Sequence, residues 1–257
     1  MTQSQEIPSQ ETIAQSQFGP QAKAYIASAA HAQGADLQRI AAIAAQHTPA
    51  HALDLGCGGG HVAYAMAPHA TRVAASDLSP EMTAAVAAEA ARRGLANVDA
   101  IAAPAAALPY ADGAFDMLAC RFSAHHWQDV PAGLREARRV LRAGVVAVFA
   151  DVYAPALAAA DTHLQAVELL RDPSHVRDYS EVEWRAMLGQ AGFAITAITK
   201  GRLRMDFADW TERQRTTPDR VAAVRALQSL ASSEVARHFE IEADGSFTID
   251  TILIEAV

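Results

Sequence analysis

A short apolar run that breaks into glycines constrains the fold more than any other segment of the chain. Residues 51–62 are HALDLGCGGGHV, so the run carries a carboxylate at Asp54 and continues into Gly56, Gly58 and Gly60. Glycine has no Cβ and tolerates positive φ, which lets a strand-to-helix turn approach a ligand closely. Asp77 ends a second apolar run about twenty residues downstream, where a carboxylate accepts both hydroxyls of a ribose. The segment therefore predicts an α/β domain that binds a nucleoside.

The glycine spacing indicates which nucleoside this is. A dinucleotide fingerprint has the pattern G-x-G-x-x-G, but His61 stands at its third glycine when the count starts from Gly56. Asp54 lies just ahead of the turn, where its charge would repel a pyrophosphate. The same carboxylate suits a ligand that carries an ammonium and a sulfonium group.

Three later segments resemble motifs of one enzyme family. They are ALPYADGAFD at 107–116, RFSAHHW at 121–127, and the stretch at 134–144 that begins LRE and ends LRAG. Together with the glycine turn, they resemble the class I S-adenosylmethionine-dependent methyltransferases over about residues 50 to 152. The small-molecule branch is the most similar, with its ubiquinone- and menaquinone-type C-methyltransferases and many uncharacterised bacterial relatives.

The resemblance implies a fold, a cofactor and a reaction. The fold is a Rossmann-like, mostly parallel sheet with an antiparallel last strand, helices on both faces and a helical lid. The cofactor is S-adenosyl-L-methionine, and the reaction is in-line transfer of its methyl group to a small molecule. The motifs place the cofactor against Asp54, Gly56, Cys57, Gly58, Gly60, Asp77, Leu78, Met82, Pro104, Ala105, Ala106 and Arg121.

Pro104 departs from the family pattern. The family usually has an acid at this position, which accepts a hydrogen bond from the adenine amino group. Proline offers no side-chain acceptor, so adenine recognition falls to the backbone groups of Ala105 and Ala106. The departure motivates an alternative function, in which the chain is an inactive S-adenosylmethionine-binding partner or regulatory module. A third alternative, methylation of protein or RNA, predicts an open groove.

Two adjacent histidines are the candidates for catalysis. His125 and His126 follow the fourth expected strand, at the carboxyl edge where donor and acceptor should meet. A histidine is the natural base if the acceptor must lose a proton, and we prefer His126 over His125. Packing against a helix is the alternative role for either one. No metal site is expected, because no recurrent ligand spacing occurs.

Residues beyond the motifs are candidates for contact with the acceptor. One candidate is a tyrosine on an expected N-terminal helix. Others lie in a polar stretch after the fifth expected strand, and one is a tryptophan in the expected lid. Packing or solvent exposure is the alternative for each. The substrate candidates are Tyr25, His175, Arg177, Tyr179 and Trp210.

Periodicity and capping signals divide the chain into four parts. Residues 1–17 are rich in Gln, Ser and Glu and are expected to form a flexible tail, and residues 18–48 to form helices over the site. Residues 49–200 and 247–257 form the core, with strands expected at 52–55, 72–77, 98–103, 115–120, 145–151, 193–199 and 247–254. Residues 201–246 are too long for a plain hairpin and are expected to form a helical lid.

Composition narrows the possible partners. The formal net charge of −8 disfavours nucleic acid, whose binding depends on clustered Lys and Arg. Cys57 and Cys120 lie in apolar segments and are expected to be free thiols. No signal peptide or membrane span is apparent, so the expected location is cytoplasmic. A homodimer is compatible with the sequence.

Overall fold

A seven-stranded sheet forms the centre of the molecule in the computed structural model, which describes residues 7–21 and 34–257. The strand order is β3-β2-β1-β4-β5-β7-β6. β1 to β5 are parallel, whereas β7 runs antiparallel to both β5 and β6. The strands are β1 His51–Leu55, β2 Arg72–Asp77, β3 Val98–Ala102, β4 Met117–Arg121, β5 Ala147–Val152, β6 Ile195–Met205 and β7 Phe247–Ala256. This confirms the predicted mostly parallel sheet that ends in an antiparallel strand.

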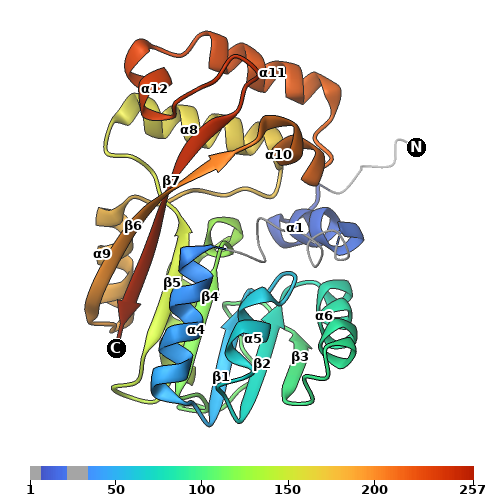
Figure 1. Ribbon diagram of the computed structural model, residues 1–257, viewed down its shortest axis with the longest axis vertical. Coiled ribbons are helices and arrows are strands. Elements are labelled where there is room, and N and C mark those ends of the chain that lie inside the picture. Colours follow the sequence, from blue (N-terminus) through green and yellow to red (C-terminus); the bar gives the residue numbers. More distant parts are fainter. Residues whose placement is uncertain (1–6, 22–33) are drawn as a thin grey trace.

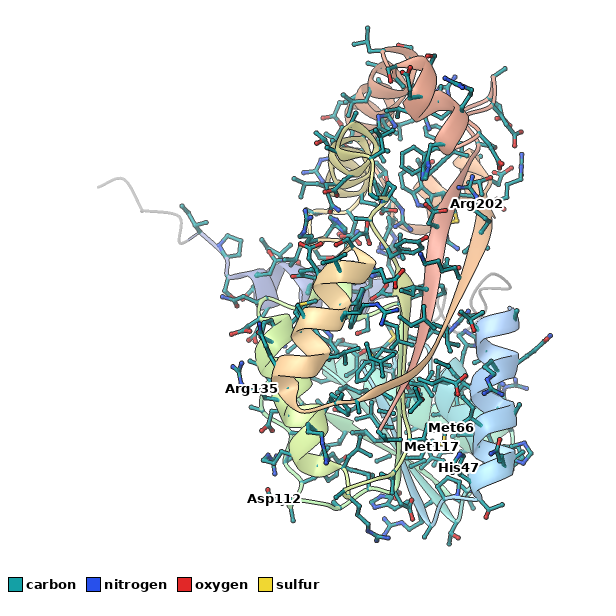
Figure 2. All side chains as sticks on the ribbon, turned by 90° about the vertical axis from the view of Figure 1, so that its left-hand side faces the viewer. His47, Met66, Asp112, Met117, Arg135 and Arg202 are labelled. Atoms are coloured by element: carbon teal, nitrogen blue, oxygen red, sulfur yellow. The ribbon has the colours of Figure 1, made fainter. Side chains whose placement is uncertain are left out.

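Helices cover both faces of the sheet, as Figure 2 shows with α4 on one side and α7 and α9 on the other. One face packs against α4 Ala35–His47, α5 His61–Met66 and α6 Pro80–Arg92. The other packs against α7 Val130–Val140 and α9 Glu181–Ala191. Side chains of a strand alternate between the faces, so Ala52 belongs to the first apolar cluster and Leu53 to the second.

A separate group of helices forms a cap beyond the carboxyl ends of the parallel strands (Figure 1). The cap helices are α8 Ala158–Arg171, α10 Phe207–Arg213, α11 Pro218–Ser229 and α12 Ser233–His238. They share a third apolar cluster with the upper end of β7, in which Leu164, Trp210, Val224 and Phe239 are buried. The cap therefore has a core of its own, joined to the main sheet through β6 and β7.

The lid boundaries differ from the expectation. β6 continues to Met205 instead of ending at Thr199, and it pairs with β7 along its whole length. The period-two pattern in fact persists, with Leu203 and Met205 on one face and the charged Arg204 between them. The helices begin only at Phe207, and α8 packs with them although it precedes the predicted lid.

The N-terminal assignments also need correction. The predicted tail over residues 1–17 is wrong from Gln10 onward, because α1 spans Gln10–Phe18 with Ser9 as its N-cap. Glutamine side chains hold this helix against the rest of the protein; for example, Gln10 Nε2 donates to the Ser174 carbonyl at 2.7 Å. A search for apolar periodicity does not detect such polar contacts. Of the helices predicted over residues 18–48, α4 forms at Ala35–His47, but it packs on the sheet face next to α5 and not over the site.

Among the residues that the structure describes, no helix has the length and apolarity that crossing a bilayer requires. Both cysteines are buried free thiols, as predicted.

Candidate functional site

The glycine turn follows β1 and forms one wall of a cavity. Gly56 and Gly58 have φ of +70° and +47°, which side chains with a Cβ rarely adopt. A Cβ on Gly56 would lie 1.9 Å from Ser123 Oγ, so the turn packs against the loop after β4. A Cβ on Gly58 would meet nothing within 4 Å, because this residue faces open space. Gly60 is not part of the cavity wall; its Cβ would instead collide with the Tyr64 ring.

Asp77 holds the glycine turn in place. Its Oδ2 accepts a hydrogen bond from the Gly58 amide at 2.9 Å, and its Oδ1 accepts one from the Ser79 amide at 3.0 Å. Burial raises the pKa of Asp77, while these amide bonds favour the charged form. Ser79 in turn caps α6, and Leu78 and Met82 beside it line the cavity. Asp77 thus shapes the turn and faces the cavity at the same time.

Asp54 is almost fully buried beneath the turn. Burial raises its pKa to about 7, although the Ala63 amide donates a hydrogen bond to its Oδ2 at 2.9 Å and favours the charged form. The charge of Asp77 raises the pKa further. The pair is therefore an acidic pocket that a cation would stabilise, because a positive charge nearby favours the ionised carboxylates.

Pro104, Ala105 and Ala106 lie on the cavity wall just after β3. The Ala103 amide donates to the Asp77 carbonyl at 2.8 Å, which fixes this loop next to Asp77. Cys57 and Arg121 also reach the cavity. The Arg121 guanidinium is paired with Asp36 of α4 and lies over the Phe122 ring.

The cavity extends from the glycine turn to the cap and has a volume of about 660 Å³. Residues from α1 close one side: Glu11, Ala14 and Phe18 all line it. At the far end the walls come from β4, β5, the cap helices and the upper strands: Phe122, Val152, Glu168, Arg171, Leu203, Met205, Trp210, Arg213, Gln214 and Ile249. A space of this size suits small molecules, for which pockets span about 300–1,000 Å³.

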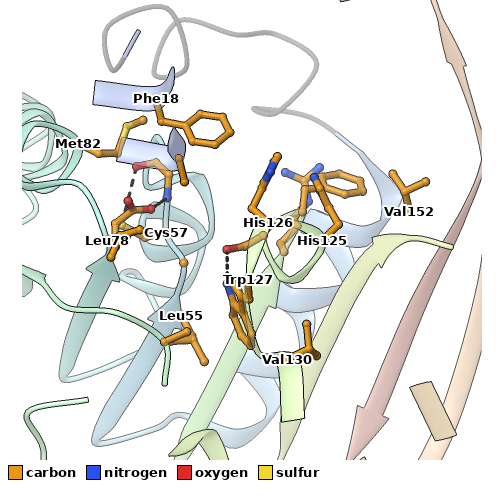
Figure 3. A pocket seen from close by; sticks show the side chains of 18 of the residues that line it. Phe18, Leu55, Cys57, Leu78, Met82, His125, His126, Trp127, Val130 and Val152 are labelled. Carbon is orange, nitrogen blue, oxygen red and sulfur yellow. Dashed lines mark hydrogen bonds between the residues drawn. The ribbon is translucent and has the colours of Figure 1, made fainter. Parts of the chain in front are cut away.

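His125 and His126 stand side by side in the middle of this cavity (Figure 3), with ring centroids 4.1 Å apart. His125 Nδ1 is 2.6 Å from Asp151 Oδ1, at the end of β5. Burial lowers the pKa of His125, but the charge and hydrogen bond of Asp151 outweigh it and raise the pKa to about 9. His125 is therefore a cation near neutral pH.

His126 has the opposite protonation state. Its Nδ1 donates to the Ser174 carbonyl at 3.2 Å, and the edge of the Phe18 ring of α1 contacts it. Burial and the neighbouring charge of His125 lower its pKa to about 4. His126 is thus neutral and fixed by the loop after α8.

Two of the predicted substrate residues lie outside the cavity wall. His175 is buried behind His125, with Nε2 3.0 Å from Gln165 Oε1, and burial lowers its pKa to about 2. Arg177 is not among the residues of the cavity wall and pairs with Asp161 and Glu183. Chain position alone cannot separate inward from outward side chains on an irregular loop.

The other substrate predictions have a different outcome. Tyr179 and Trp210 do line the cavity, and Trp210 is also part of the cap core. The prediction for Tyr25 lies outside the described residues. No group of three or more His, Cys, Asp or Glu within the described ranges is arranged to hold a metal ion.

Sequence reasoning missed several residues of the site. Asp151 and Asp178 were not singled out, nor were Phe18 of α1 and the apolar wall of the cap. A usable signal existed for Asp151, because it is a carboxylate at the end of a predicted parallel strand. Asp178 had no such signal, since its position depends on how a loop folds against α8.

Comparison with known proteins agrees with this geometry. Residues 53–149 match the family model described as a methyltransferase domain. The chain is 32% identical over 245 residues to YcgJ of Bacillus subtilis, which is named as an uncharacterized methyltransferase, and the match covers 93% of this chain and 97% of that protein. The chain belongs to the class I S-adenosylmethionine-dependent methyltransferases.

Further relatives support the assignment. The crystal structure of YcgJ superimposes with a TM-score of 0.82 and covers 86% of this chain and 97% of that one. The protein YafE of Escherichia coli is 40% identical over 197 residues, covering 77% of this chain and 95% of YafE. The demethylmenaquinone methyltransferase of Thermus thermophilus is 36% identical over 116 residues, which is 43% of this chain and 52% of that enzyme.

The cofactor of this methyltransferase is S-adenosylmethionine, and the residues at the glycine turn fit it. The open space at Gly58 admits a ligand next to the backbone. The buried acids Asp54 and Asp77 match a nucleoside that carries positive charge.

Proposed function

We propose that this methyltransferase acts on a small molecule held between the sheet and the cap. The observation that carries the proposal is the cavity itself, which runs from the glycine turn to the cap and is walled by α1 and the cap helices. A protein or RNA acceptor would need an open groove instead. A formal net charge of −8 further disfavours an RNA substrate.

The chain's own residues would perform three tasks. Asp54, Asp77 and the loop at Pro104 would hold the cofactor, which supplies an activated methyl group when bound. The apolar walls of the cap would exclude water and position the acceptor, which provides much of the catalysis in such a transfer. His125 would accept the proton that the acceptor loses.

We assign the proton-accepting role to His125 and not to His126, in contrast to the preference drawn from sequence. Asp151 would stabilise the imidazolium that forms on His125, whereas His126 has no carboxylate at hydrogen-bond distance among the described residues. A resting pKa of about 9 means that His125 must lose its proton before it acts as a base. Activity should therefore rise with pH toward 9.

A labelled-methyl experiment tests the class of acceptor. The enzyme is incubated with methyl-labelled S-adenosylmethionine and a cell extract, and the products are separated by acid precipitation and size. We expect label among small molecules, with none when Gly58→Val replaces the wild type. Label in precipitated protein or RNA would refute the proposal.

The inactive-module alternative makes a different prediction in the same experiment. Such a protein would bind the cofactor but transfer no label to any fraction. The cavity next to His125 and Asp151 favours the enzyme.

A further inference from the structure

One carboxyl oxygen in the cavity wall is buried without a hydrogen-bond partner among the residues that the structure describes. Asp178 is 1% exposed, it lines the cavity, and its Oδ2 is buried without a hydrogen bond. His175 Nε2 lies 3.9 Å from this oxygen. His175 is neutral near pH 7 and directs that nitrogen to Gln165, so the contact is not an ion pair.

The backbone around Asp178 is held firmly. Gln165 of α8 accepts from the Asp178 amide at 3.0 Å and donates to its carbonyl at 2.9 Å. The Ala154 amide after β5 donates to the next carbonyl, that of Tyr179, at 3.2 Å. The side chain is thus fixed at the cavity wall, and leaving a buried polar group unsatisfied costs free energy. This combination is typical of a group that a ligand satisfies.

The surroundings of Asp178 indicate the kind of ligand group. Asp151 and Glu168 also lie near His125, and both carboxylates, with Asp178, act on its pKa. A carboxylate or phosphate on the acceptor would be repelled here. A cationic group would be repelled by the charge of His125 and by the cationic cofactor. A neutral hydroxyl group avoids both penalties and donates a hydrogen bond to a carboxyl oxygen.

Most of the other side chains at this end of the cavity are apolar, namely Phe122, Val152, Leu203, Met205, Trp210 and Ile249. Glu168, Arg171, Arg213 and Gln214 also line it, and Arg171 is paired with Glu168. We infer that Asp178 binds a hydroxyl group of the methyl acceptor while the apolar side chains hold a hydrocarbon body. The inference rests on the proposed small-molecule function and names a substrate class: a hydroxyl-bearing, uncharged, largely apolar molecule.

Equilibrium binding tests the inference without any turnover. Calorimetry is performed on the protein saturated with S-adenosylhomocysteine, using three probes of one skeleton: 2-naphthol, 2-methylnaphthalene and 2-naphthoate. Burial raises the pKa of Asp178, so the range for one hydrogen bond to a neutral group applies, and we expect 2-naphthol to bind about twofold to tenfold more tightly than 2-methylnaphthalene. We expect 2-naphthoate to bind more weakly than both.

Two variants identify the residue responsible. Asp178→Leu should abolish the preference for 2-naphthol and leave the affinity for 2-methylnaphthalene unchanged or higher. Glu212→Gln, which removes an exposed acid on α10, is the control and should keep the wild-type preference. Asp178→Leu should melt at the same or a higher temperature, because it removes an unsatisfied buried carboxyl; a purely structural Asp178 would give a lower one.

Several results would overturn the inference. They are equal binding of 2-naphthol and 2-methylnaphthalene to the wild type, tighter binding of 2-naphthoate, failure of all three probes to bind, or a 2-naphthol preference that survives in Asp178→Leu. Methyl transfer plays no part in these measurements, so they fail independently of the proposed function. Conversely, label found only in macromolecules would refute the function while leaving the probe-binding result intact.

Discussion

Cofactor affinity should depend on pH mainly through the buried carboxyl group of Asp54. Its pKa of about 7 means that the cofactor-free protein carries a largely neutral Asp54 below this pH. A cationic ligand favours the carboxylate, so binding must release the proton. If the bound carboxyl is ionised throughout, affinity falls about fiftyfold between pH 7 and pH 5, following the ionised fraction of the free protein.

Calorimetry in buffers of different ionisation enthalpy measures both the cofactor affinity and the number of protons released on binding. We expect S-adenosylmethionine binding to release about one proton near pH 5.5 and about half a proton at pH 7. Asp54→Asn keeps the shape and the acceptor for the Ala63 amide, and it should bind weakly with a much flatter pH profile. An unchanged pH slope or unchanged proton release in Asp54→Asn would refute the reasoning.

The same group links pH to the stability of the cofactor-free protein. The folded pKa of Asp54 is raised above its ordinary value of 3.8, so its stabilising contribution is present below that value and is lost as pH rises through about 7. The loss amounts to at most about 4 kcal/mol, at about 1.4 kcal/mol per pKa unit. Asp54→Asn should therefore unfold at a higher denaturant concentration than the wild type at pH 8, and a clear loss of stability would contradict this.

Three further predictions follow from the cavity walls. Gly58→Val should abolish cofactor binding in calorimetry, because a branched side chain would occupy the ligand space and strain a residue at φ +47°. The variant should stay folded by circular dichroism. Wild-type affinity in the folded variant would place the ligand elsewhere. Pro104→Asp should tighten S-adenosylhomocysteine binding by about threefold to a hundredfold, the range for one gained hydrogen bond, and an analogue without the adenine amino group should show no gain. Gln17→Ala removes the hydrogen bonds from α1 to Gln214 and should therefore be cleaved faster than the wild type within α1 in limited proteolysis. If docking of α1 depends on this contact, added cofactor should not slow the cleavage to the wild-type rate.

Much of the fold was predictable because it follows local rules. The alternation of apolar runs with helical segments gave the parallel sheet, and Ser79 and Ser180 cap α6 and α9 as their sequence positions indicate. The glycine turn was equally local. α1 was missed because its docking depends on Gln10 and residues of the distant loop after α8, which no periodicity records.

The residues of the candidate site also fall into two groups, those that local sequence predicts and those that depend on distant contacts. Asp54, Gly58 and Asp77 belong to contiguous motifs and could be placed by spacing alone. The pairing of His125 with Asp151 depends on the alignment of β4 with β5, and the choice between the two histidines depends on burial and nearby charge. Residue type cannot supply that information.

We propose that the cofactor site and the acceptor site share one cavity. A crystal structure of the complex with S-adenosylhomocysteine tests it most directly. We expect adenosine between Asp77 and Ala105, with the sulfur facing His125 and open space remaining toward Trp210. A sulfur that faces bulk solvent, or a ligand that fills the space beside Trp210 and leaves the glycine turn empty, would contradict the account.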